Sequence, residues 1–291
     1  MFAIFERNNQ VNSGKIFMGS TEETRDTLID RKSPYSGEVV SRMPLCNAED
    51  TKRALEIAKR ATKDTASSPL HQRVSWLEDV ADKLRTYRED IALTIVDEVA
   101  KPLAFARVEV DRCIETIELT AKELVALHGE TIPTDIAPSG KKTIAYFTRV
   151  PVGVVACITP FNFPLNLVAH KIAPALGAGN AVVLKPTPEA PLTSYKLAKL
   201  FNSSKYAIKD ALSVVYGDVE VGSTLVKSPI PRVLSFTGSV PVGNIITKEA
   251  GIKKVSLELG GNAGTYIDKS ADYIYASKRC AIGAFINSGQ V

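Results

Sequence analysis

The sequence predicts an α/β protein built on a doubly wound parallel sheet, and three patterns predict it. From residue 152 onward, apolar runs of strand length alternate with segments of helical periodicity. Before residue 129 the periodicity is mostly helical, which indicates N-terminal helices that pack on the sheet. Residues 129–150 contain two β-prone runs, GETIPTD and KKTIAYFTR, around a turn-rich Pro-Ser-Gly segment, which predicts a hairpin arm.

The clearest element is a strand–helix–strand unit over residues 152–188. An apolar run at its start predicts a buried strand, and helical spacing over 167–175 leads to a second strand at 181–184. In open α/β sheets, ligands gather at the carboxyl ends of such strands. Asn162 and Lys185 both follow a strand end, so we expect them at a binding site.

The other elements are predicted in chain order. In the N-terminal part we expect a strand at 38–40 and helices after the capping pair Asn47 and Asp50, after Pro69, and over 91–99 and 103–127. Further on we expect helices at 191–201, 221–226 and 242–250, and strands at 212–215, 232–236 and 254–258. Residues 263–267 and a helix over 271–285 would begin a second α/β domain.

The composition excludes several classes of protein. A hydrophobic content of 45% and a charged content of 23% are ordinary for a globular protein, and a net charge of +4 over 291 residues does not indicate a nucleic-acid partner. No apolar run reaches the roughly 18 residues of a membrane span, and MFAIFERNN is too short and too soon charged for a signal peptide. The cysteines show no metal spacing, so we expect a cytoplasmic protein without metal whose cysteines are reduced and buried: Cys46, Cys113, Cys157 and Cys280.

Several motifs together resemble the NAD(P)-dependent aldehyde dehydrogenases. TPFNFP followed by KIAPALGAGNAVVLKP is similar to that family, and PYSGEVV, SFTGS, LELGG and FINSGQV agree in the same order over nearly the whole chain. The resemblance implies a Rossmann-like NAD(P) domain at 151–260, after an N-terminal segment at 1–128 and an oligomerisation arm at 129–150. Residues 261–291 would start the catalytic domain. It also implies a small aldehyde substrate, as in the lactaldehyde, glyceraldehyde-3-phosphate and succinate-semialdehyde relatives, and a homo-dimer or homo-tetramer.

Two residues have a catalytic role implied by the resemblance. The side-chain amide of Asn162 would donate to the oxyanion, although an Asn here could simply cap the following helix. Glu258, in LELGG, would be the general base that activates water, since a buried carboxylate at a strand end otherwise has no task.

The nucleophile implied by the resemblance lies outside this sequence. The family pattern N-x-G-Q-x-C places the cysteine directly after Val291, and Cys157 and Cys280 are expected to be core residues. We therefore expect the chain to be the N-terminal part of the enzyme and inactive, with a UGA codon following Val291. The alternatives are a non-catalytic fragment that binds nucleotide or subunits, and the product of a disrupted gene.

The resemblance also implies the residues that bind NAD or NADP. Lys185 could be merely solvated, but by resemblance it contacts the adenosine ribose or a 2′-phosphate. Relatives that prefer NAD carry a glutamate three residues after this lysine. Here Pro188 stands there and Glu189 follows. A missing or displaced carboxylate removes the repulsion that excludes a 2′-phosphate, so NADP is expected as well as NAD.

Two glycine-containing turns complete the expected cofactor site. Gly217 and Gly222 resemble a relaxed phosphate loop or form a simple turn, whereas the strand end at 236–239 leads into a helix and suits a pyrophosphate. The full expected set is Ile158, Thr159, Pro160, Phe161, Lys185, Pro188, Glu189, Gly217, Gly222, Phe236, Thr237, Gly238, Ser239, Val242, Leu259 and Gly260.

Two further patterns resemble functional sites but are expected to be structural. Tyr195 and Lys199 fit the Y-x-x-x-K pair of short-chain dehydrogenases, but they lack that family's N-terminal glycine motif, so we expect a surface helix. His170 lies in a helix among apolar neighbours, without a partner for metal binding.

Overall fold

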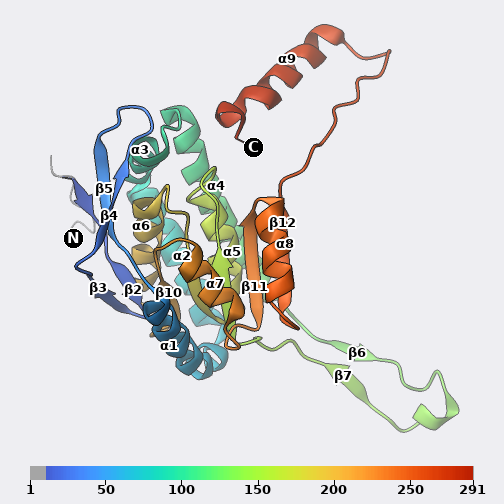
Figure 1. The fold of residues 1–291 in the computed structure, drawn as a ribbon. Helices are drawn as coiled ribbons and strands as arrows, with labels where there is room; N and C mark the ends of the chain where they lie inside the picture. The colour runs from blue at the N-terminus through green and yellow to red at the C-terminus, as the bar shows by residue number, and fades with distance from the viewer. Residues whose placement is uncertain (1–10, 291) are drawn as a thin grey trace.

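A seven-stranded sheet in the order β12-β11-β8-β9-β10-β2-β3 forms the centre of the molecule in the computed structural model, which describes residues 11–290 (Figure 1). The strands that run parallel are β8 (Val154–Ile158), β9 (Ala181–Lys185), β10 (Leu212–Val214), β11 (Val233–Gly238) and β12 (Lys254–Leu259). The chain runs from β8 outward to β10 and then returns across β8 to β11. The predicted doubly wound sheet is confirmed, and its switch point lies between β8 and β11.

The connecting helices are α5 (Asn166–Gly177), α6 (Pro191–Asn202), α7 (Val219–Lys227) and α8 (Val240–Glu249). α5 and α6 are backed by N-terminal helices, and α7 and α8 pack on the other side with α1. Because helices cover both faces of the sheet, β8, β9 and β10 are buried along nearly their whole length. This burial explains why their sequences are mostly apolar runs.

The N-terminal helices are α1 (Ala48–Ser67), α2 (Leu70–Thr86), α3 (Arg88–Val99) and α4 (Leu103–Glu123), followed by a 3-10 turn (Leu124–Ala126). The predicted capping box is present, because Asn47 and Asp50 bond each other's backbone amides at the start of α1. The Trp76 indole is fully buried and donates to the carbonyl of Phe201 at 2.9 Å, which joins α2 to α6. These helices therefore share one hydrophobic core with the sheet.

The N-terminal strands were only partly predicted. β5 (Val39–Pro44) overlaps the expected strand and pairs with β1 (Asn12–Ser13) and β4 (Leu28–Lys32) in a separate small sheet. β2 (Ile16–Met18) and β3 (Thr21–Glu23) were not predicted, yet they extend the main sheet beyond β10. They are very short, so their pairing depends on the edge that β10 offers.

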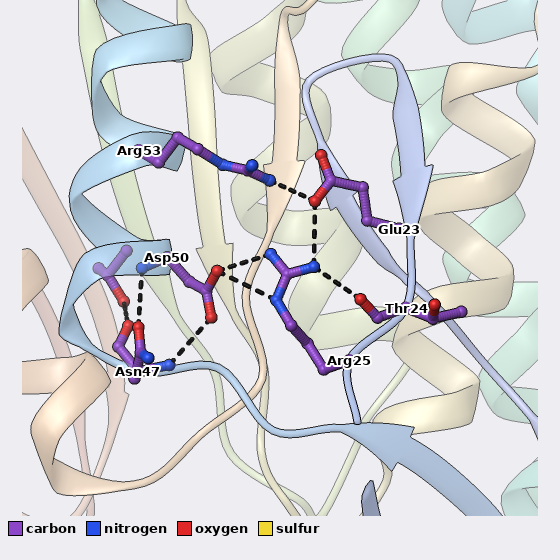
Figure 2. Close-up of polar contacts among 7 residues, drawn as sticks. Glu23, Thr24, Arg25, Asn47, Asp50 and Arg53 are labelled. Atoms are coloured by element: carbon purple, nitrogen blue, oxygen red, sulfur yellow. Dashed lines mark hydrogen bonds and ion pairs between the residues drawn. The ribbon is translucent and has the colours of Figure 1, made fainter. Parts of the chain in front are cut away.

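A network of charged side chains joins β3 and the residue Arg25 after it to α1 (Figure 2). The Arg25 guanidinium donates to Asp50 at 2.6 and 3.1 Å and to Glu23 at 3.0 Å, and Arg53 also contacts Glu23. The side chains are partly exposed, so each pair contributes little by itself, about 1 kcal/mol or less. Because Asp50 also caps α1, the network fixes the chain after β3 against the start of that helix.

Two segments extend away from the main body (Figure 1). The predicted hairpin is confirmed as β6 (Glu130–Ile132) and β7 (Ala145–Phe147), with a 3-10 turn (Pro138–Gly140) in the loop between them. After β12 the chain runs without regular structure to α9 (Tyr273–Phe285) and a 3-10 turn (Ile286–Gly289). No side chain of α9 is buried.

Several expectations need correction. Cys280 is not a core residue, since α9 lies apart from the sheet and leaves this thiol partly exposed; Cys46, Cys113 and Cys157 are buried as expected. The helix that carries Tyr195 is also not a surface helix, because α2, α3 and β10 cover it. Within residues 11–290 no helix is long and apolar enough to cross a bilayer, and the signal-peptide expectation lies outside the described residues.

Candidate functional site

A cavity of about 840 Å³ opens at the switch point of the sheet. One part of its wall comes from the carboxyl ends of β8, β11 and β12, which the parallel topology brings to one edge. The rest comes from α4 and α5 and from Gly289 and Gln290. The predicted site residues that line it are Pro160, Phe161, Asn162, Thr237, Gly238, Ser239, Glu258, Leu259 and Gly260. Segments about a hundred residues apart in sequence thus meet around one space.

Asn162 lies in the turn between β8 and α5. Its amide Nδ2 donates to the carbonyl of Gln290 at 2.7 Å, and its Oδ1 accepts from the amide of Phe163 at 3.1 Å. Asn162 does not cap α5, because Glu109 Oε1 accepts from the Leu165 and Asn166 amides at 2.9 and 3.2 Å. The capping interpretation is therefore wrong, and the Asn162 amide instead faces the end of the described chain.

Glu258 lies on β12, opposite Thr237 in the register of β11. We expected it to be buried, and it is exposed. β12 is an edge strand whose side chains alternate: Leu257 and Leu259 pack partly toward the core, whereas Ser256 and Glu258 face out. The Glu258 carboxylate can therefore meet water on the cavity wall.

Lys171, on α5, is a residue of the cavity wall that sequence reasoning missed. It is buried, and its Nζ donates to the hydroxyl of Ser235 at 3.1 Å. Burial lowers the pKa of Lys171, and the nearby Cys157 and Glu258 side chains oppose that shift. The available signal was a lysine beside His170 within a mostly apolar helix. Its neighbour His170 also lines the cavity, but no group of residues in the described chain could hold a metal ion.

Lys185, at the end of β9, lies outside this cavity and is buried, so the solvated alternative is wrong. Its Nζ has a long hydrogen bond of 3.4 Å to the carbonyl of Pro186. Burial lowers the pKa of Lys185, although the charges of Asp218 and Glu189 act against this. A Cβ added to Gly222 would lie 3.7 Å from Lys185 Cδ, so the start of α7 covers this side chain closely.

The residues after Lys185 do not form one cluster. Thr187 Oγ1 donates to the carboxylate of Glu189, which holds that carboxylate in place. Pro188 is exposed, and with Gly217 it lines a separate small pocket beside Tyr216. Pro188 and Gly217 are therefore not brought to the large cavity.

The remaining predicted residues lie at the ends of β8 and β11 or on α8. Phe236 is buried, and a Cβ on Gly238 would lie 2.5 Å from its ring, so this turn requires glycine. Ile158 is partly buried, and Thr159 is buried with a hydroxyl that has no hydrogen-bond partner among the described residues. Val242 is exposed on α8. The residues of this group that do not line the cavity are Ile158, Thr159, Phe236 and Val242.

No cysteine of the described chain lines the cavity. Burial raises the pKa of Cys157 to about 12 and that of Cys46 to about 11, and it also raises that of Cys113. A thiol with such a pKa carries almost no thiolate at neutral pH, so none of these three can act as a nucleophile.

Comparison with known proteins agrees with this geometry. The chain is 38% identical over 283 residues to a 3-sulfolactaldehyde dehydrogenase of Priestia aryabhattai, covering 97% of this chain and 59% of the relative. It is 39% identical over 267 residues to a lactaldehyde dehydrogenase of Methanococcus aeolicus, covering 90% and 56%. The crystal structure of an NADP-dependent glyceraldehyde-3-phosphate dehydrogenase from Bacillus halodurans, complexed with NADP, superposes with a TM-score of 0.93 at 36% identity, covering 97% of this chain and 60% of that one.

The chain thus spans well under two thirds of the length of these relatives. Residues 20–291 match the aldehyde dehydrogenase family. With the doubly wound sheet and the residues gathered at its switch point, this match places the chain in a family: it belongs to the aldehyde dehydrogenases.

Proposed function

We propose that this chain supplies the nucleotide-binding part and two catalytic groups of an enzyme that oxidises a small aldehyde to a carboxylic acid with NAD or NADP. The observation that carries the proposal is the cavity at the switch point, where Asn162 and Glu258 share one space with the turn at 237–239. In this proposal residues 1–128 support the cofactor domain, 129–150 form an assembly arm, 151–260 bind the nucleotide and 261–291 begin the catalytic domain.

The residues present fit a dinucleotide. Lys185 is a buried ammonium with a single long hydrogen bond among the described contacts, so it can still donate to ribose hydroxyls or a 2′-phosphate. Ser239 starts α8 without a side-chain capping bond, so the first amides of that helix can receive a pyrophosphate near Gly238. A nucleotide bound there would supply the hydride acceptor.

NADP is proposed to bind at least as tightly as NAD. The position three residues after Lys185 is a proline, and the nearby carboxylate of Glu189 already accepts from Thr187. A carboxylate that is hydrogen-bonded within the protein competes less for the ribose hydroxyls and repels a 2′-phosphate less than a free one. One relative named above was solved with NADP.

The two catalytic groups have complementary tasks. The Asn162 amide would stabilise the oxyanion formed on the aldehyde carbon, an effect typically worth about 10²–10³ in rate. Glu258, exposed on the cavity wall, would take a proton from the water that frees the acid from a cysteine thioester. The resemblance places that cysteine directly after Val291, so residues 1–291 by themselves would lack the nucleophile.

The test separates nucleotide binding from turnover. A fluorescence titration of residues 1–291 with NADPH should saturate, and Gly238→Ala should weaken binding by about tenfold, since the added Cβ displaces the turn from Phe236. Lactaldehyde with NAD or NADP should yield no reduced nucleotide. Turnover that survives replacement of all four cysteines would contradict the proposed chemistry, and a titration without saturation would contradict the proposed binding.

A further inference from the structure

A buried ion pair lies directly beneath the turn that carries Asn162. Lys101, in the loop between α3 and α4, contacts the carboxylate of Glu109 on α4, and both side chains are almost completely buried. A charge pair removed from water is expensive to form, so it persists where its remaining donors and acceptors are also satisfied. Here the turn between β8 and α5 satisfies them.

The pair holds both ends of this turn. Lys101 Nζ donates to the backbone carbonyl of Asn162 at 2.7 Å. Glu109 Oε1 accepts from the backbone amides of Leu165 and Asn166 at 2.9 and 3.2 Å, which belong to the N-cap residue and the first residue of α5. The carboxylate thus caps α5 from a neighbouring helix, a position where negative charge is favourable.

The same turn is clamped by further contacts of Lys101. Its ammonium lies 4.2 Å from the centre of the Phe163 ring, a cation–π distance. The residue before Lys101 is Ala100, which ends α3 in a left-handed conformation with φ 53° although it is not a glycine. Such a conformation is unfavourable for alanine and persists only when the surrounding contacts require it.

We propose that Lys101 and Glu109 are positioning residues that set the conformation of the turn at 160–166 and hence the place of the Asn162 amide at the cavity. Neither residue lines the cavity, so both act through the turn. The role at the oxyanion rests on the function proposed above, whereas control of the turn does not depend on it.

The chain contains a matched control pair. Lys196 on α6 contacts the carboxylate of Asp90 on α3, and both side chains are largely buried. Neither residue lines the cavity. Lys101→Met and Lys196→Met each leave a buried carboxylate without its lysine, so both should lower the midpoint of urea unfolding. Glu109→Gln is a milder variant of the first pair and covers the case in which Lys101→Met fails to fold.

Two readouts separate positioning from general stability. Hydrogen exchange of a peptide spanning 162–167, followed by mass spectrometry under native conditions, should quicken by about tenfold in Lys101→Met and Glu109→Gln. Affinity for NADP should fall by about tenfold in these variants, because Pro160 and Phe161 line the cavity. Affinity for 2′,5′-ADP should stay unchanged, because Lys185 lies outside the cavity. Lys196→Met should change none of the three measurements.

The inference is overturned if exchange at 162–167 is unaltered in both variants of the Lys101–Glu109 pair, or quickens equally in Lys196→Met. Equal losses of NADP and 2′,5′-ADP affinity would also overturn it, since they indicate a general loss of structure. If the unaltered chain binds no NADP, the proposed function fails, and the exchange measurement alone still decides whether this ion pair controls the turn.

Discussion

Replacing Lys185 with methionine should make the ligand-free protein more stable and its NADP complex weaker. In the free protein the Lys185 ammonium is buried at the end of β9, and its Nζ donates one long hydrogen bond to the carbonyl of Pro186. Methionine keeps much of the side-chain volume and removes the charge. Exchanging a poorly satisfied buried charge for an apolar side chain is often stabilising, and we expect a gain of about 1–2 kcal/mol in the free energy of unfolding at pH 7.

The pH dependence of this gain has a defined sign. Burial lowers the pKa of Lys185 from 10.5, so between its folded pKa and 10.5 the unfolded chain binds more protons than the folded one. This lysine therefore makes the free energy of unfolding rise with pH through that window, and its cost is fully present below it. The advantage of Lys185→Met should accordingly shrink as the pH approaches 10.5.

The loss of affinity follows from the donor that is removed. One hydrogen bond from an ammonium to a ribose hydroxyl or a 2′-phosphate contributes about 1.5–3 kcal/mol, or about 10- to 100-fold in Kd. The loss should be larger for NADP than for NAD. Isothermal titration with both nucleotides measures it, and urea unfolding at pH 7 and pH 10 measures the stability.

Two results would refute this reasoning. If Lys185→Met binds NADP as tightly as the unaltered chain, the adenosine does not lie at this lysine. If the variant is less stable at pH 7, the electrostatic attraction to Asp218 and Glu189 outweighs the cost of burial. Lys196→Met provides the contrast, because it leaves the carboxylate of Asp90 without this lysine and should lose stability.

Three further changes test the backbone and the hairpin. Gly179→Ala should lower the free energy of unfolding by about 2 kcal/mol, because φ is +84° and the new Cβ would lie 2.9 Å from Pro151 Cγ and 3.2 Å from the carbonyl of Thr65; a neutral result in urea unfolding would contradict this. Ala100→Gly should raise the free energy of unfolding by about 0.5 kcal/mol, because glycine adopts the left-handed conformation without strain, at some entropic cost. A lower free energy in urea unfolding would contradict strain at Ala100. Ile144→Lys, at a hairpin side chain that is 88% exposed, should reduce the mass seen by light scattering without changing stability, and an unchanged mass would reject the hairpin as an assembly arm.

Local pattern was enough to predict most elements of the sheet and helices. The apolar run of β8, the helical spacing of α5 and the capping box of α1 are properties of neighbouring residues, so they can be recognised without knowledge of the fold. The position of Asn162 at a strand end predicted a binding site, whereas the catalytic roles of Asn162 and Glu258 were implied by a resemblance in motif order, which carries no information on distance. They meet at one cavity because β8, β11 and β12 lie side by side in the parallel sheet. The sequence indicated only that strands alternate with helices, not the order of the strands in the sheet.

Other features depend on contacts between distant residues, and the sequence alone did not reveal them. β2 and β3 are too short to show a pattern, and their pairing depends on the exposed edge of β10. Glu258 is exposed because it alternates along β12 with the partly buried Leu257 and Leu259, whereas Lys185 is buried because α7 closes over it.

The order and type of the main elements and the motifs that indicate the family can be recognised in the sequence, because they rest on local spacing. Which polar side chains are buried, and what they contact, depends on how distant segments pack together. Lys101 and Glu109 illustrate the reason: they stand eight residues apart, one in a loop and one in the helix that follows it, and folding brings both against the turn at Asn162.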